Sequence, residues 1–221
     1  MSAASARLSG VRLYLISDAS PPGGLIRLLE AAVRGGVDMF QLREKNFADS
    51  ALLEAAASCA RTCSRLGVPF IVNDRADIAL AAHADGVHLG QDDLPVGAAR
   101  ALLGPAAIIG LSTHSREQID AAGRDVDYMG VGPIHETPTK PGRPAVGLDL
   151  LRYAAAHAAQ PFFAIGGLDP GNLAEAVRAG AQRISILRWI AQAPDPEAAA
   201  RDVRDAMDHA TAGASCERAT T

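Results

Sequence analysis

The chain has 221 residues, a formal net charge of -4 and a sequence pI of about 5.8. This length favours one large domain, and the acidic balance argues against a nucleic-acid-binding face, which needs clustered basic residues. A small anionic ligand is still compatible, because a local group of cations can form in an acidic protein. No run of sequence approaches the roughly 18 apolar residues of a membrane span.

The first residues and the cysteines bear on the location of the protein. The opening "MSAASARLSG" lacks the hydrophobic core of a secretory signal, so we expect residues 1–11 to be a flexible terminus. An organelle-targeting segment is the alternative, because this stretch contains Arg and Ser and no acidic residue. The three cysteines, Cys59, Cys63 and Cys216, have no framework spacing, which is typical of reduced thiols in a cytoplasmic protein.

The rest of the chain alternates between short apolar runs and helical stretches. Eight runs rich in Val, Ile and Phe predict strands, and they occupy residues 12–17, 39–44, 69–74, 86–90, 107–113, 128–133, 161–167 and 183–187. Each is followed by an amphipathic, Ala- and Leu-rich stretch that predicts a helix: residues 25–36, 50–67, 76–84, 96–104, 115–123, 148–158, 171–180 and 197–210. Gly or Pro usually separates a helix from the next strand.

Strict alternation of strand and helix predicts a parallel sheet with helical crossovers. Eight such units favour a single-domain (β/α)8 TIM barrel over residues 12–211, followed by a disordered tail over residues 212–221. An open doubly wound sheet is the alternative, but "SDASPPGG" after the first strand does not match its phosphate-binding loop.

Cationic side chains follow the second predicted strand, at the end where barrel enzymes place their chemistry. Gln41, Arg43 and Lys45 are spaced by two and therefore share a face. Lys140 can join them from the long loop after the sixth strand. Arg offers a planar fork and Lys a point charge to phosphate oxygens, so this group predicts a site for several negative charges. A solvated strand end is the alternative interpretation.

Two carboxylates at the ends of neighbouring strands predict a divalent cation. Asp74 and Asp93 would repel each other unless a positive charge lay between them, and Mg2+ prefers one or two carboxylates together with substrate oxygens and water. The alternative is that each aspartate caps the helix that follows it.

A second anion pocket is predicted after the seventh and eighth strands, the usual phosphate position in this fold. Gly166 and Gly167 would let backbone N–H groups approach an anion, and Arg188 lies after the next strand. A tight turn and an exposed rim arginine are the alternatives. His88 and His114 are secondary candidates for acid/base roles, whereas Trp189 is expected to cover the outside of the last strand.

At these residues the chain resembles the thiamine-phosphate synthase family. The matching stretches are "QLREK", "NDR", "GVHLGQDDLP", "STH", "TPTKPG" and "AIGG", in this order and at predicted strand ends. The resemblance extends from about residue 12 to about residue 206. It implies a (β/α)8 barrel that joins a pyrimidinylmethyl diphosphate to a thiazole ethyl phosphate, releasing pyrophosphate, with Mg2+ as cofactor.

The resemblance also implies roles for individual residues. The pyrimidine diphosphate would be bound by Gln41, Leu42, Arg43, Glu44, Lys45, Asn73, Ser112 and Lys140, of which Arg43, Lys45, Ser112 and Lys140 would be catalytic. Mg2+ would be bound by Asp74 and Asp93. The thiazole phosphate would be bound by Thr137, Pro138, Thr139, Gly167, Leu187 and Arg188. Arg188 departs from the small hydroxyl residue that many members carry there.

Two other functions stay open at this point. A thiazole tautomerase has a similar fold and a histidine at the position of His114, but it would not need the cations and carboxylates described above. A non-catalytic barrel that senses a phosphate ligand is the second alternative. The expected partners are small-molecule substrates, with no nucleic acid and no membrane, and a homodimer is plausible on general grounds.

Overall fold

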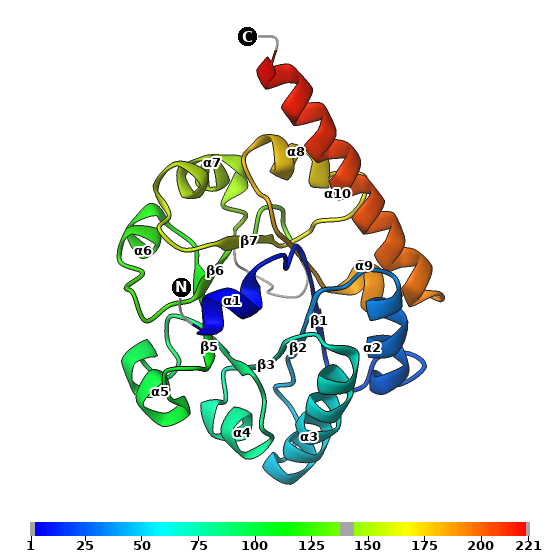
Figure 1. Cartoon of the computed structure of the whole chain (residues 1–221), viewed down its shortest axis with the longest axis vertical. Coiled ribbons are helices and arrows are strands. Elements are labelled where there is room, and N and C mark those ends of the chain that lie inside the picture. The colour runs from blue at the N-terminus through cyan, green and yellow to red at the C-terminus, as the bar shows by residue number, and fades with distance from the viewer. Residues whose placement is uncertain (1–2, 138–143, 220–221) are drawn as a thin grey trace.

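Eight parallel strands close into a barrel in the computed structural model, which describes residues 3–137 and 144–219. Each strand pairs with its neighbours in chain order, and β1 pairs with β8 to complete the ring (Figure 1). The predicted single-domain (β/α)8 barrel is therefore confirmed. The strands are β1 (Leu13–Ser17), β2 (Met39–Leu42), β3 (Phe70–Asn73), β4 (Gly86–Leu89), β5 (Ile108–Thr113), β6 (Tyr128–Val131), β7 (Phe162–Ile165) and β8 (Ile184–Ile186).

A ring of helices surrounds the strands (Figure 1). Their bounds are α1 (Ala3–Leu8), α2 (Leu25–Arg34), α3 (Asp49–Leu66), α4 (Ala76–Ala81), α5 (Val96–Leu103), α6 (Arg116–Asp120), α7 (Gly147–His157), α8 (Leu173–Arg178), α9 (Arg188–Ala191) and α10 (Pro196–Ala219). None of the helices in the described ranges is both long and apolar enough to cross a membrane.

Two hydrophobic layers form because successive side chains of a strand point to opposite faces. In β1, Leu13 and Leu15 belong to the large layer between strands and helices, whereas Tyr14 and Ile16 face the inside of the barrel. The same alternation in β2 sends Phe40 and Leu42 outward. The inner positions near the carboxyl ends of the strands therefore carry the side chains that a ligand can reach.

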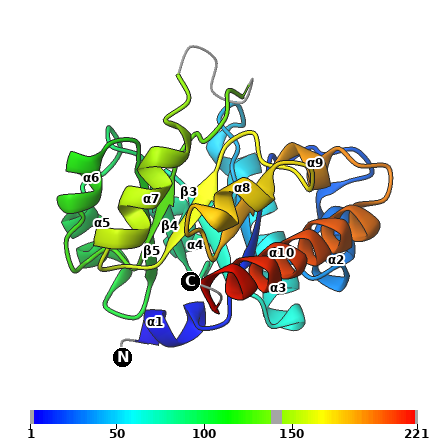
Figure 2. The same cartoon turned by 90° about the horizontal axis from the view of Figure 1, so that it is seen from above.

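The N-terminal segment closes the opposite end of the barrel as helix α1, where the sequence led us to expect a flexible terminus. Helix α1 lies across the opening of the barrel in Figure 1 and beneath it in Figure 2. Ala4 is fully buried, and Leu8 and Val11 are only 3% and 4% exposed. All three pack into the inner layer with Tyr14, because the amino end of the barrel would otherwise leave apolar side chains in water.

The C-terminal boundary also differs from the sequence-based expectation. Helix α10 continues to Ala219 instead of ending at residue 211, and it packs beside α8 and α2 (Figure 1). Residues 212–219 are helical, so a disordered tail is not seen within this range.

Three aspartates tie strand pairs together at the amino end of the barrel. Asp38, Asp85 and Asp127 each precede an even-numbered strand and accept a backbone N–H from the preceding odd-numbered strand, at 2.7–2.9 Å. Each also pairs with an arginine, namely Arg204, Arg7 and Arg100 respectively. These charge-assisted bonds fix how adjacent strands align.

The remaining pair of an odd strand with the next even strand, β7 with β8, lacks this carboxylate. Arg183 occupies the corresponding position before β8, and burial lowers the pKa of its guanidinium. Within the described residues its Nε is buried without a hydrogen-bond partner. The backbone bond from Ala164 to the Arg183 carbonyl, at 2.9 Å, aligns β7 and β8 instead.

The buried helix α1 generates a stability prediction. Leu8→Ala removes a side chain that is 3% exposed and should lower the free energy of unfolding by about 2 kcal/mol or more. Leu102→Ala is the matched control, because Leu102 also lies in a helix but is 45% exposed, and it should change stability by less than about 0.5 kcal/mol. Urea denaturation measures both, and equal effects would contradict a structural role for α1.

Candidate active site

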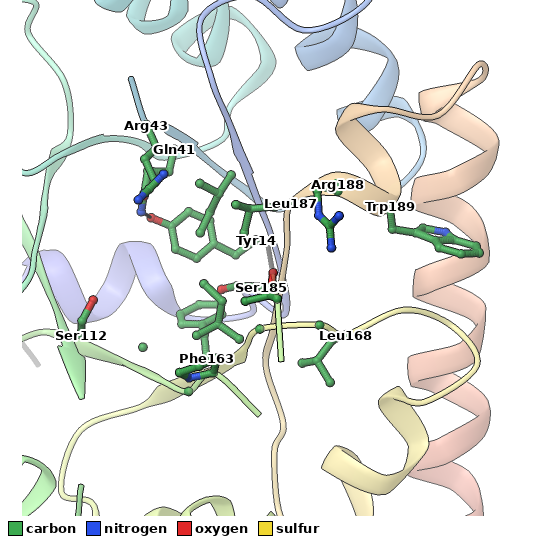
Figure 3. Close-up of a pocket in the computed structure, with 18 of the residues that line it drawn as sticks. Tyr14, Gln41, Arg43, Ser112, Phe163, Leu168, Ser185, Leu187, Arg188 and Trp189 are labelled. Atoms are coloured by element: carbon green, nitrogen blue, oxygen red, sulfur yellow. Dashed lines mark hydrogen bonds between the residues drawn. The ribbon is translucent and has the colours of Figure 1, made fainter. Parts of the chain in front are cut away.

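A cavity of about 440 Å3 opens at the carboxyl ends of the strands. It is lined by residues of all eight strands or of the loops that follow them, so it is the central site of the barrel. Figure 3 shows Gln41, Arg43 and Ser112 on one side of this cavity and Arg188 and Trp189 on the other. These residues are far apart in sequence, and the closed barrel brings them around one cavity.

Three predicted ligand-binding residues line the inner part of the cavity. Gln41, Asn73 and Ser112 are 1%, 8% and 9% exposed, and they lie on the inward face, at or one residue before the ends of β2, β3 and β5. Buried amide and hydroxyl groups at this depth need partners, because a polar group left unpaired away from water is costly. Gln41 meets this need by donating to the Tyr14 hydroxyl, and Ser112 by bonding to His88 at 3.0 Å.

The predicted stretch from Leu42 to Lys45 divides into different environments. Arg43 lines the cavity, whereas the Leu42 side chain packs into the outer hydrophobic layer and could offer a ligand only its backbone. The Glu44 carboxylate accepts the backbone N–H groups of Lys45 and Asn46 at 2.8 Å each. Glu44 therefore shapes the loop, and Lys45 extends from it with its side chain 56% exposed.

Asp74, Asp93 and Lys45 form a charged cluster beside the cavity. Lys45 Nζ lies 3.3 Å from Asp74 Oδ2, and Asp93 Oδ2 accepts the backbone N–H of Gly90 at 2.7 Å. Burial, together with the contact with the Asp93 carboxylate, raises the pKa of Asp74, although Lys45 acts in the opposite direction. The two carboxylates therefore lack full charge compensation.

Helix capping does not account for these aspartates. The N-caps of α4 and α5 are Arg75 and Pro95, and neither makes a side-chain capping bond. Asp74 instead adopts a left-handed backbone conformation with φ of 63°, which Asp and Asn tolerate better than most residues. The backbone N–H of Asp74 donates to the His88 carbonyl at 2.8 Å.

The aspartate pair fits a hard divalent cation. Mg2+ is typically held by one or two carboxylates while substrate oxygens and water complete its shell. No group of three or more His, Cys, Asp or Glu in the described ranges is arranged to hold a metal. Asp74 and Asp93 could therefore hold Mg2+ only in an open shell, as an ion shared with a phosphate ligand would require.

The predicted second pocket lies across the cavity. Gly166 and Gly167 have φ of 103° and 65°, and a Cβ on Gly167 would lie 2.7 Å from the Cβ of His135. Only glycine therefore fits at Gly167, where the backbone forms the wall of the cavity. Thr137, Leu187 and the exposed Arg188 also line the cavity. Pro138, Thr139 and Lys140 lie outside the described residues.

Aromatic side chains that the sequence did not single out form much of the cavity wall. Tyr14, Tyr128 and Phe163 pack edge-to-face with ring centroids 5.2–5.9 Å apart. Burial raises the pKa of both tyrosine hydroxyls, which therefore stay protonated. These residues lie within apolar runs, where the sequence does not distinguish a cavity wall from a core.

Three further side chains extend this description. His88 bonds to Tyr128 and Ser112 at 3.0 Å each, and His114 bonds through Nδ1 to the Gly132 carbonyl. Trp189 is 46% exposed and lines the cavity mouth, so the expectation that it covers the outside of β8 is wrong. It belongs to α9, which begins at Arg188 and carries the tryptophan to the rim.

A closed parallel barrel with a cavity at the carboxyl ends of its strands, lined by an arginine and by buried amide and hydroxyl groups, is typical of a barrel enzyme with a small-molecule substrate. Residues 13–190 match the family described as thiamine monophosphate synthase. The chain belongs to this family, whose members are transferases.

Individual relatives agree with this assignment. The chain is 52% identical over 201 residues to the thiamine-phosphate synthase of Acidothermus cellulolyticus, covering 89% of this chain and 95% of the relative. It is 46% identical to that of Thermosynechococcus vestitus, but there it spans only 56% of a longer relative. The structure of thiamine phosphate pyrophosphorylase from Pyrococcus furiosus superimposes with a TM-score of 0.81 at 30% identity, covering 90% of this chain and 96% of the other.

The raised pKa of Asp74 generates a prediction without substrate. The ionised form of Asp74 is disfavoured in the folded chain. The folded state therefore loses stability relative to the unfolded state as the pH rises through the raised pKa. Asp74→Asn keeps the tolerated left-handed backbone and removes the charge. We expect its unfolding temperature in metal-free buffer at pH 8 to rise by a few degrees, and stabilisation by MgCl2 to be lost.

Asp92→Asn is the control for this experiment. It makes the same change one residue from Asp93, on an exposed side chain, and should leave both the unfolding temperature and the response to MgCl2 unchanged. Differential scanning fluorimetry at several MgCl2 concentrations measures the two variants. An Asp74→Asn variant that still responds to MgCl2 like the wild type would remove Asp74 from the metal site.

Proposed function

We propose that the chain joins 4-amino-2-methyl-5-pyrimidinylmethyl diphosphate to thiazole ethyl phosphate, forming thiamine phosphate and releasing pyrophosphate. The observation that carries this proposal is the charged cluster of Lys45, Asp74 and Asp93 beside a cavity lined by Arg43. A diphosphate with a divalent cation matches these charges. The names of the relatives support the same reaction.

The inner part of the cavity would hold the pyrimidine. Gln41, Asn73 and Ser112 supply buried amide and hydroxyl groups around a ring-sized space with aromatic walls. Arg43 and Lys45 would neutralise the diphosphate oxygens at the rim, and Lys140 is proposed to join them. A ring placed in the floor with its charged group at the mouth leaves the methylene carbon facing the rest of the cavity.

Mg2+ is proposed as the cofactor, held by Asp74 and Asp93. When bound, it would supply charge neutralisation for the leaving diphosphate. The protein presents two carboxylates that are already close together, so that little rearrangement is needed when the ion binds.

The second substrate would occupy the opposite side of the cavity. Its phosphate is proposed to meet the backbone at Gly167 and the Arg188 guanidinium, with Thr137, Pro138, Thr139 and Leu187 alongside. The carbon–oxygen bond to the diphosphate breaks and its electron pair leaves with that group. The lone pair of the thiazole nitrogen then forms the new carbon–nitrogen bond, so this step needs no general base.

One assay distinguishes this proposal from its alternatives, neither of which the family relatives favour. Both substrates with MgCl2 should yield thiamine phosphate and pyrophosphate in equal amounts. A thiazole tautomerase would instead convert a thiazole without the diphosphate, and a sensor would release its ligand unchanged. Whether the thiazole carries a carboxylate is decided by supplying both forms.

Two further features are proposed. A cytoplasmic location is supported by Cys59 and Cys63, which are buried free thiols. A homodimer is proposed on the general frequency of such assemblies alone.

Arg43→Gln tests the proposed contact between Arg43 and the diphosphate. Loss of a charged hydrogen-bonding fork should lower kcat/KM for the pyrimidine diphosphate by about 100-fold. Arg152→Gln is the matched control, because Arg152 is exposed on α7 and pairs with Asp149, and its activity should equal that of the wild type. Equal activity of the two variants would contradict the proposed role of Arg43.

The second pocket is tested by Arg188→Ala. We expect KM for the thiazole phosphate to rise about tenfold with little change in kcat, because a charged contact to a non-reacting phosphate contributes to binding. Arg178→Ala, at the end of α8, is the control and should leave KM unchanged. Steady-state kinetics with the thiazole phosphate varied decides, and an unaltered KM in Arg188→Ala would move the phosphate elsewhere.

A further inference from the structure

Five polar side chains form a continuous hydrogen-bonded chain across the floor of the cavity. Gln41 Nε2 bonds to Tyr14 Oη, and Tyr14 Oη lies 2.9 Å from Tyr128 Oη. Tyr128 Oη lies 3.0 Å from His88 Nδ1, and His88 Nε2 lies 3.0 Å from Ser112 Oγ. These residues come from five different strands, and Figure 3 shows Gln41 directed at the ring of Tyr14.

The chemistry of the first member determines the direction of the whole chain. An amide nitrogen can donate hydrogen bonds but cannot accept them, so Tyr14 Oη must accept from Gln41. The single hydrogen of Tyr14 is then directed to Tyr128, and that of Tyr128 to His88 Nδ1. Both phenols keep their hydrogens, because burial raises the pKa of each.

We propose that Gln41 fixes His88 as the neutral tautomer with its hydrogen on Nε2, and that Ser112 is thereby made a hydrogen-bond donor toward the bound ligand. Tyr14 and Tyr128 are positioning residues that transmit this direction. His88 Nε2–H donates to Ser112 Oγ, so the single hydrogen of Ser112 cannot point back to His88.

A hydrogen on His88 Nδ1 would require the hydrogen bonds between Tyr128 and Tyr14 to run in the opposite direction. Protonation of Nδ1 would require Tyr128 to accept from His88 and to donate to Tyr14 instead. Tyr14 Oη would then accept from both Tyr128 and Gln41, and its own hydrogen would have neither of these partners in a fully buried position. The donation from Gln41 to Tyr14 therefore favours a hydrogen on Nε2 of His88 over one on Nδ1.

This arrangement determines what the ligand must offer. Within the described residues, His88 is the hydrogen-bond partner of the Ser112 hydroxyl, and Ser112 lines the cavity. The Ser112 hydrogen therefore selects an acceptor atom on the ligand and disfavours an N–H at that place. Resting on the proposed function, that acceptor belongs to the pyrimidine diphosphate.

The first test reads the tautomer in the free protein. Long-range 15N–1H correlation spectra of histidine-labelled enzyme distinguish the two neutral forms and the imidazolium, and the signal of His88 is assigned by its loss in His88→Gln. We expect hydrogen on Nε2 and none on Nδ1 between pH 6 and 8. An Nδ1–H tautomer or an imidazolium would overturn the proposal.

Gln41→Glu tests whether the side chain at residue 41 determines the tautomer of His88. A carboxylate can only accept, so Tyr14 should donate to it, Tyr128 to Tyr14, and His88 Nδ1–H to Tyr128. The variant should therefore move the hydrogen of His88 from Nε2 to Nδ1 at a pH where the 13C shift of the new carboxyl shows it ionised. An unchanged tautomer under that condition would refute control by Gln41.

Two controls separate the chain from a simple effect of charge. Gln192→Glu places the same change in the wall of the same cavity but outside the chain, and it should leave the tautomer of His88 unchanged. Tyr128→Phe breaks the chain between Tyr14 and His88, so adding Gln41→Glu to it should have no further effect. A change of the His88 tautomer in Gln192→Glu, or between Tyr128→Phe and the double variant, would indicate a field effect and contradict the proposal.

The role of Ser112 is tested through turnover. Tyr128→Phe should raise KM for the pyrimidine diphosphate about tenfold, the size of one lost hydrogen bond, and leave KM for the thiazole phosphate unchanged. Equal changes in both constants would contradict a directed Ser112 donor. The spectra need no substrate, so an enzyme without the proposed activity would fail this assay alone and leave the tautomer assignment intact.

Discussion

The closure of β8 onto β1 is the constraint on which the rest of the structure depends. Once the sheet is a ring, its two faces are an enclosed interior and a helix-covered exterior, and each strand divides its residues between them. For this reason Leu42 packs in the outer hydrophobic layer, whereas its neighbour Gln41 lines the cavity. The interior is filled at the amino end, by α1 and by apolar side chains, so only the carboxyl end is left to receive a ligand.

The cavity combines two kinds of polar environment. Its floor holds neutral groups that are linked by hydrogen bonds, and these bonds offset the cost of burying polar atoms. Its rim holds unbalanced charge, where Asp74 and Asp93 meet with Lys45 as a partial counterion. A ligand with an uncharged ring and a strongly charged group would complement both environments at once.

Much of this could be predicted from sequence, because the alternation of apolar runs and helices reports the fold directly. The rim residues could be found too, since polar side chains at the end of a buried strand have no role in a core. Tyr14 and Tyr128 could not, because an aromatic residue within an apolar run looks the same whether it is core or cavity wall. Helix α1 was missed because "AASARL" is short and weakly apolar, and its burial depends on an opening that exists only in the folded barrel. The roles assigned to Lys140 and Thr139 stay predictions.

The four pairs that an odd-numbered strand forms with the even-numbered strand after it are not equivalent at the amino end of the barrel. Three are locked by an aspartate that reaches the neighbouring backbone, while Arg183 takes that place in the fourth. Among these four pairs, β7 and β8 are thus the one pair without the aspartate bond. At the other end of these strands lie Gly167 and Arg188. A shift of β7 against β8, together with the part of the cavity wall that they carry, would therefore break no aspartate bond, unlike the same shift within the other three pairs.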